Sequence, residues 1–304
     1  MSTEWDNYWQ GRSGVRAGAA LDGVGVETHT GIAGFWDDIF TPLTPTSKLV
    51  DLACGAGTVL RRAQAAGISD LTGADISSGA ITALQTNMQD VQGVVCALPK
   101  TPFTNGQFDI AVSQFGFEYA GAYDAATEIA RIIAPGGQFA ALAHYKGGAI
   151  DKECAAKSAK AHVLIDSRYL DVAKDVFAAA NAQDQVSYNA AITALSEPRK
   201  TLDELARSGM ALAKHIQAGT AQMFGRLQNY ALPDVIGWLD GNAAEVTAYL
   251  SRMEAMQNAA LSADDVAKIG AALRKGGMAP LEPDVFAPDG DAKPIAWTIR
   301  ASKP

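Results

Sequence analysis

The sequence contains few basic residues and no dense run of them. Of its 304 residues, 25 are Lys or Arg and 33 are Asp or Glu, which gives a formal net charge of −8. Proteins that bind DNA or RNA neutralise phosphates with basic patches, so this balance argues against a polynucleotide ligand. We therefore expect no nucleic-acid partner.

Cysteines and long apolar runs are scarce as well. Cys54, Cys96 and Cys154 lack paired spacing, which argues against both a disulfide framework and a zinc site, so we expect no metal. No window reaches the roughly 18 apolar residues of a membrane-spanning helix. The N-terminal stretch MSTEWDNYWQGR lacks the basic and apolar regions of a signal peptide. We expect a cytoplasmic protein with no membrane partner.

Short apolar runs alternate with helical stretches between residues 48 and 145. The expected strands are 48–53, 70–77, 91–98, 108–116 and 137–145, and the expected helices are 58–67, 78–89 and 123–134. This alternation predicts βαβ units and a parallel, doubly wound α/β sheet. Pro135-Gly136-Gly137 is expected to end the last helix and start the last of these strands.

Residues 151–277 are rich in Ala, with apolar positions at helical spacing, and predict a helical insertion. Within it, Thr201 with Glu204 and Ser262 with Asp265 have the spacing of capping boxes. Residues 278–304 then predict closing strands, with a hairpin turn at Asp289-Gly290 that makes this end of the sheet antiparallel. We expect the insertion to cap a substrate pocket above the core of residues 48–150.

The stretch LVDLACGAGTVL, residues 49–60, places a glycine turn between a strand and a helix. Such a turn lets the backbone approach a ligand closely. A dinucleotide-binding loop would carry a third glycine, but Leu60 stands there, and the carboxylate of Asp51 would repel a diphosphate. The same carboxylate suits a ligand that carries an ammonium group.

A second acid, Asp75, ends the next predicted strand, where a carboxylate can accept both hydroxyls of a ribose. The two acids and the glycine turn therefore describe a ligand with an amino-acid end, a nucleoside end and no phosphate between them. S-adenosylmethionine fits this description.

Four motifs in the same order resemble class I S-adenosylmethionine-dependent methyltransferases. They are DLACGAG at 51–57, Asp75, CALPKTPFTNGQFDIAVSQFGFEY at 96–119 and EIARIIAPGGQFA at 128–140. The resemblance implies a Rossmann-like fold, S-adenosylmethionine as cofactor and an enzyme of the EC 2.1.1 type. It implies methyl transfer to an acceptor, for which we expect a small molecule.

Carried over residue by residue, the resemblance implies a set of cofactor contacts. The methionine end would lie at Asp51, Ala53, Gly55 and Gly57, the ribose at Asp75, the adenine at Ile76, Ala97 and Leu98, and the sulfonium near Ser113 and Gln114. Two positions depart from the family pattern. Ala53 replaces a glycine, and Cys96 stands where an Asp often binds the adenine amino group.

The N-terminal segment WDNYWQGR resembles helices that fold over the cofactor in this family. Residues 1–47 are therefore expected to form a lid, with Tyr8, Trp9 and Arg12 close to the cofactor. His29 is interpreted as a loop residue that could join this lid.

Two residues at the rim of the predicted sheet are candidates for a catalytic base. Glu118 follows the fourth predicted strand and His144 ends the fifth. A solvated loop acid and a hydrogen-bonded structural histidine are the alternatives for these two positions. The oligomeric state is expected to be a monomer or a homodimer.

Two other functions stay open at this point. An NAD-dependent oxidoreductase would need an atypical glycine loop. A non-catalytic module that binds S-adenosylmethionine or mediates dimerisation would fit the departure at Cys96.

Overall fold

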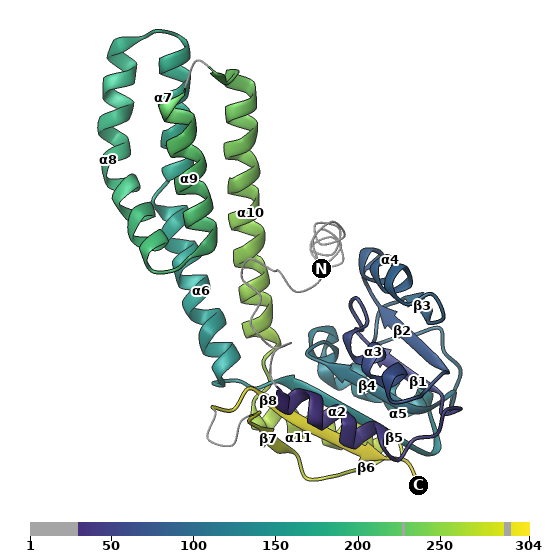
Figure 1. Cartoon of the computed structure of the whole chain (residues 1–304). Coiled ribbons are helices and arrows are strands. Elements are labelled where there is room, and N and C mark those ends of the chain that lie inside the picture. Colours follow the sequence, from purple (N-terminus) through teal and green to yellow (C-terminus); the bar gives the residue numbers. More distant parts are fainter. Residues whose placement is uncertain (1–29, 227–228, 289–292) are drawn as a thin grey trace. The chain divides into compact units, whose positions relative to one another are not determined.

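The computed structural model describes residues 30–226, 229–288 and 293–304. It divides into two compact units, residues 1–152 with 256–304 and residues 153–255 (Figure 1). The predicted lid residues Tyr8, Trp9 and Arg12, and His29, lie outside the described residues, as does the predicted turn at Asp289-Gly290. Their roles stay predictions.

The first unit contains one eight-stranded sheet with the order β3-β2-β1-β4-β5-β8-β6, and β7 also pairs with β8. The strands are β1 (Leu49–Leu52), β2 (Leu71–Asp75), β3 (Gln92–Val95), β4 (Phe108–Gln114), β5 (Ile133–His144), β6 (Ala279–Pro280), β7 (Asp284–Phe286) and β8 (Ala296–Ser302). Strands β1 to β5 are parallel, whereas β8 is antiparallel to its neighbours. The predicted α/β fold class is confirmed.

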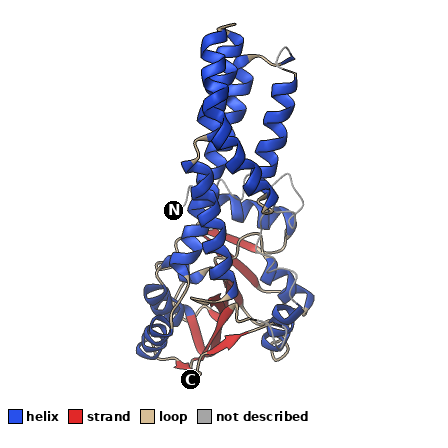
Figure 2. Ribbon diagram, turned by 90° about the vertical axis from the view of Figure 1, so that its left-hand side faces the viewer, coloured by secondary structure: helices blue, strands red, loops and turns tan. Residues whose placement is uncertain are grey.

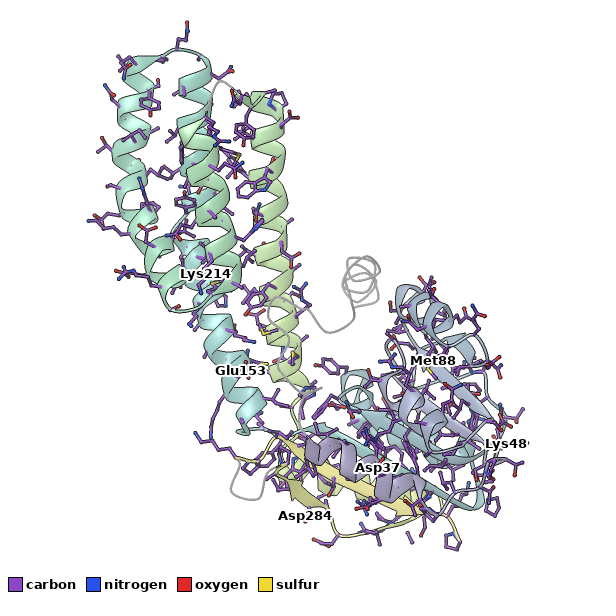
Figure 3. All side chains as sticks on the ribbon, in the orientation of Figure 1. Asp37, Lys48, Met88, Glu153, Lys214 and Asp284 are labelled. Carbon is purple, nitrogen blue, oxygen red and sulfur yellow. The ribbon has the colours of Figure 1, made fainter. Side chains whose placement is uncertain are left out.

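Helices pack on both faces of this sheet. On one face lie α2 (Thr30–Phe40), α3 (Thr58–Ala65) and α4 (Ser78–Asn87), and on the other lie α5 (Ala122–Ile132) and α11 (Ala263–Lys275). Gly73 on β2 makes room for Leu60 of α3 and Leu84 of α4, since an added Cβ would lie 3.0 Å or less from both side chains. An ion pair between Arg62 of α3 and Asp37 of α2, at 2.8 Å, joins two of the helices (Asp37 is labelled in Figure 3).

Strand β5 begins earlier than the sequence predicts. The sequence predicts that Pro135-Gly136-Gly137 ends the helix and that the strand starts at Gly137, but β5 runs from Ile133 and contains all three residues as an irregularity in its pairing with β4. Gly136 has φ 81°, and its N–H donates to the carbonyl of Lys303 at 2.7 Å. The backbone beside β8 therefore pairs with the glycine segment, so the strand continues through it.

The second unit contains most of five helices and no strand among its described residues (Figure 2). They are α6 (Ala149–Asp166), α7 (Tyr169–Asn181), α8 (Gln185–Arg207), α9 (Ala211–Gly225) and α10 (Leu232–Ala259). Inside this unit the rings of Phe177 and Phe224 stack at 4.3 Å, and the Tyr169 hydroxyl donates to Thr220 Oγ1 at 2.8 Å. None of the helices in the described ranges is long and apolar enough to cross a membrane.

The predicted insertion, 151–277, is longer than this unit because α11 belongs to the first unit and packs beside α5. Leu261, just before α11, pairs with Tyr145 at the end of β5. The capping box of Ser262 and Asp265 is confirmed at the start of α11. The one predicted at Thr201 is wrong, because α8 runs through this position and Thr201 Oγ1 donates to the carbonyl of Glu197.

Candidate functional site

A cavity of about 550 Å³ lies at the carboxyl ends of the parallel strands. Its walls come from the β1–α3 loop, the ends of β2 and β4, the loop after β3, and the short helix η2 (Phe117–Ala120). The strand order reverses between β1 and β4, and open α/β sheets bind ligands at such a point.

The structure gathers most of the predicted cofactor residues around this cavity. Those that line it are Asp51, Ala53, Gly55, Asp75, Ile76, Ala97, Leu98 and Gln114. Gly57 is buried just outside the lining and precedes α3 with φ 84°. An added Cβ at Gly57 would lie 2.4 Å from Leu84 Cδ1, so this position requires glycine for both its conformation and its space.

The β1–α3 loop follows a tight path with two further residues at positive φ. Gly55 has φ 51°, and Ala53, which replaces a glycine of the family pattern, has φ 58°. A residue with a Cβ is strained in this region. The Cβ of Ala53 also lies against Gly116 after β4, where an added Cβ would be 2.5 Å away.

Asp75 joins the tips of β2 and β1. Its Oδ2 accepts a hydrogen bond from the backbone N–H of Gly55 at 2.9 Å, and its Oδ1 accepts one from the N–H of Ser77 at 2.9 Å. These bonds stabilise the ionised carboxylate and fix the glycine loop. Each oxygen of an ionised carboxylate has two lone pairs, so it can accept more than one hydrogen bond.

Asp51 lies on the neighbouring strand in a different environment. Its side chain is 2% exposed, and its Oδ1 has no hydrogen-bond partner among the described residues. Burial raises the pKa of the Asp51 carboxyl well above its usual range, and the nearby charge of Asp75 raises it further. Two carboxyl groups at one cavity therefore differ in their preferred protonation state.

The cavity also contains two thiols that burial keeps protonated. Burial raises the pKa of Cys54 above its usual range and that of Cys96 to about 11, with nearby carboxylates adding to the effect. Neutral thiols of this kind do not act as nucleophiles at neutral pH. In the described part of the chain, no group of His, Cys, Asp and Glu side chains could hold a metal ion.

The floor of the cavity near β4 is fixed by hydrogen bonds. Gln114 lines the cavity, and its Oε1 accepts a hydrogen bond from the indole N–H of buried Trp36 on α2. Ser113, also expected near the sulfonium, is buried outside the lining, where its hydroxyl donates to the carbonyl of Leu52 at 2.7 Å. Sequence reasoning missed Trp36, because neither its spacing nor its neighbours indicate that it contacts a strand tip.

Glu118 and His144 meet in the structure, as their predicted places on one rim suggested. Glu118 Oε1 lies 2.7 Å from His144 Nδ1 and also accepts from the His144 backbone N–H at 3.0 Å. Both side chains are buried, and neither belongs to the cavity lining. Glu118 Oε2 has no hydrogen-bond partner among the described residues.

Two aromatic residues that line the cavity also contact His144 of this pair. The rings of Phe115 and Tyr119 lie 4.7 Å and 5.7 Å from the His144 imidazole. Phe115 has φ 53°, an uncommon conformation for a bulky residue that occurs mostly where the surroundings enforce it. The sequence does not indicate this strain, since only the glycine that follows Phe115 marks a turn.

The comparisons with known proteins bear on the segment that builds this cavity. A family model described as a methyltransferase domain matches residues 50–141, which include most of β1, all of β2 to β4, most of β5 and all residues of the cavity lining. Residues 50–141 are a methyltransferase domain. The resemblance to class I S-adenosylmethionine-dependent methyltransferases and the predicted cofactor, S-adenosylmethionine, are confirmed for this domain.

Solved structures give similar matches. A complex of the Haloferax volcanii Trm112 methyltransferase activator with a methyltransferase is 24% identical over 48% of this chain and 60% of that chain, with a TM-score of 0.39. Geranyl diphosphate C-methyltransferase from Streptomyces coelicolor is 22% identical over 38% of this chain and 45% of that chain, with a TM-score of 0.36. This chain thus spans about half the length of those two proteins.

A third match extends over more of the chain. An S-adenosylmethionine-dependent methyltransferase from Mesorhizobium loti is 13% identical over 93% of this chain and 100% of that chain, with a TM-score of 0.48. No curated protein matches the sequence.

Because Ala53 packs against Gly116, we expect substitutions at these two positions to have coupled effects on the free energy of unfolding. Gly116→Ala should lower the free energy of unfolding by about 1–3 kcal/mol, because its Cβ overlaps that of Ala53. In an Ala53→Gly background, Gly116→Ala should lower the free energy of unfolding by a smaller amount, because the Cβ of residue 53 is absent. Urea denaturation of the four proteins measures this coupling. Gly34→Ala, where an added Cβ meets nothing within 4 Å, is the control, and equal costs in both backgrounds would contradict the contact.

The raised pKa of Asp51 predicts a pH-dependent stability difference in the Asp51→Asn variant. With a raised folded-state pKa, unfolding releases a proton, so the stability of the wild type falls as pH rises above the unfolded-state value of about 4. The amide that replaces the carboxyl group in the variant does not titrate. The stability of the variant relative to the wild type should therefore increase between about pH 4 and about pH 7.

Denaturant unfolding of the ligand-free protein at each pH measures this difference. Asp70→Asn makes the same change at an exposed position outside the cavity, and it should show a smaller dependence on pH. A difference for Asp51→Asn that stays constant over this range would show that Asp51 titrates normally.

Proposed function

We propose that the protein transfers a methyl group from S-adenosylmethionine to a small-molecule acceptor, with release of S-adenosylhomocysteine. The charge of the cavity lining supports S-adenosylmethionine as the cofactor. The cavity is lined by two carboxyl groups and, among the described residues, by no Lys, Arg or His side chain. Such a lining favours a ligand with positive charge and disfavours a diphosphate.

The residues at the cavity fit the parts of this cofactor. The Asp51 carboxyl, which lacks a partner at Oδ1 among the described residues, would receive the ammonium group, and Asp75 would receive the ribose hydroxyls. Ile76, which is 42% exposed, would lie against the adenine with Ala97 and Leu98. The Cys96 thiol is a weak donor in place of the usual Asp, so we expect adenine to be bound mainly by apolar contact.

When bound, S-adenosylmethionine supplies a methyl group that its sulfonium already activates. The chain then has to align an acceptor with that methyl group and exclude water. Gln114, held by Trp36, and the aromatic wall of Phe115 and Tyr119 would form the acceptor side. A cavity of about 550 Å³ suits small molecules, and the net charge of −8 disfavours nucleic acids. The predicted capping role of the helical insertion stays a proposal.

The roles of Glu118 and His144 follow from their place behind this wall. Since neither side chain lines the cavity, the pair would hold Phe115 and Tyr119 in position through contacts with the imidazole. The earlier hypothesis, that one of them removes a proton from the acceptor, requires that the proton reach the pair past these rings. The two roles predict different kinetics.

Calorimetric titration tests the cofactor. The protein should bind S-adenosylmethionine with micromolar affinity and should not bind NAD. Asp75→Ala should weaken binding of S-adenosylmethionine at least about tenfold, because it removes hydrogen bonds of a charged acceptor. Asp70→Ala is the matched control and should leave the affinity unchanged. Binding of NAD alone would refute the proposal in favour of an oxidoreductase.

Fractionated cell extract tests the acceptor in the same proposal. Release of S-adenosylhomocysteine should be supported by the low-molecular-weight filtrate of the extract. If only the retained macromolecules support it, the acceptor is not a small molecule. Cofactor binding without turnover in either fraction would favour a non-catalytic module.

His144→Asn separates a positioning role from a base, because the amide can still donate to Glu118 but does not accept a proton at neutral pH. With the acceptor from the filtrate, we expect kcat to remain within about tenfold of the wild type, a raised KM for the acceptor and an unchanged pH profile. Loss of a general base would instead lower kcat about 10²–10⁴-fold and remove the acidic limb of the profile. His162→Asn, at an exposed helical position, is the control.

A further inference from the structure

Among the described residues, the titratable side chains around Asp51 carry either a negative charge or no charge. The titratable groups that share the cavity with it are Asp75, Cys54, Cys96 and Tyr119, and no cationic side chain lines the cavity. On the strands beside β1, the nearest charge is the Asp75 carboxylate at the end of β2. An ionised Asp51 would therefore be a second negative charge in a confined space, with no cationic partner among the described residues.

The hydrogen bonds of the two acids decide which of them holds a proton. Both oxygens of Asp75 accept backbone N–H groups, which stabilises the ionised form. Asp51 Oδ1 is buried and accepts no hydrogen bond from the described residues. The proton of this pair therefore belongs on Asp51, and burial of the side chain favours the same assignment by raising its pKa.

We propose that Asp51 carries a proton while no cation lies in the cavity, and that an ammonium group binding beside it displaces this proton into solvent. The inference rests on the proposed function, since S-adenosylmethionine and S-adenosylhomocysteine each carry such an ammonium group. In the exchange, the O–H bond of the carboxylic acid breaks, the proton goes to solvent or buffer, and an ion pair between carboxylate and ammonium remains. The ammonium group keeps all its own protons.

Two properties follow from this exchange. Affinity for a ligand with an ammonium group should rise as pH rises, by up to about tenfold per pH unit, until Asp51 is already ionised in the free protein. A nucleoside without the ammonium group, such as 5′-methylthioadenosine, should bind without displacing the proton. Asp51 thereby selects for the amino-acid end of the ligand.

Calorimetry of the full chain measures the displaced proton. Titrations with S-adenosylhomocysteine are carried out in two buffers of different ionisation enthalpy, over a range of pH below the pKa of the ligand's own ammonium group. We expect the observed heat to depend on the buffer and to report release of up to one proton. With 5′-methylthioadenosine, the heat should be the same in both buffers.

Two variants make the assignment specific. Asp51→Asn should bind S-adenosylhomocysteine with a heat independent of buffer and a Kd independent of pH, whereas Asp70→Asn should behave as the wild type. Circular dichroism of each variant checks its fold, and binding of 5′-methylthioadenosine checks the nucleoside part of the cavity.

Each result supports or overturns a defined statement. If the wild type binds S-adenosylhomocysteine with the same heat in both buffers, proton displacement is overturned and the proposed function stands. If the dependence on buffer persists in Asp51→Asn, the assignment to Asp51 is overturned. If S-adenosylhomocysteine does not bind at any pH, the inference and the proposed function both fail.

Discussion

The hydrogen bond from the Gly55 N–H to Asp75 joins two strand tips, and the shape of the cavity depends on it. Residues that follow a strand can leave in many directions, yet the loop after β1 must turn sharply to begin α3 at Thr58. The carboxylate on β2 fixes that turn from outside the loop. Consequently, the hydrogen bond between Gly55 and Asp75 positions the groups of both β1 and β2 that face a ligand. Asp75 therefore has a structural role in addition to its proposed role in binding.

Backbone strain near this contact is found in two loops at the cavity. Ala53 and Phe115 both have positive φ although both carry a side chain, and they lie in the loops after β1 and β4, on opposite sides of the point where the strand order reverses. The close packing of Gly116 on Ala53 joins the two loops. Strained backbone of this kind persists only where the surrounding structure determines it, and here the surroundings are buried strands and the imidazole of His144.

The sequence predicted the sheet and the acidic strand tips because both depend on local signals. Apolar runs of strand length alternate with helical periodicity up to Tyr145, and Asp51 and Asp75 each lie at a strand end that those runs define. Other features depend on contacts between distant segments. The continuation of β5 through Pro135-Gly136-Gly137 requires Lys303, and the place of Gln114 requires Trp36. Neither pairing has a signal in the local sequence.

The two acids also show why residue type alone does not define a role. The sequence predicts different ligand contacts for Asp51 and Asp75, but it does not indicate that their protonation states differ. In the structure, one accepts two backbone N–H groups and the other is buried with Oδ1 lacking a partner among the described residues, so one is stabilised as an anion and the other is not. A pair of equal anions would repel each other in the empty cavity. Unequal acids limit this repulsion when no cation is bound and still provide a second negative charge when a cation enters.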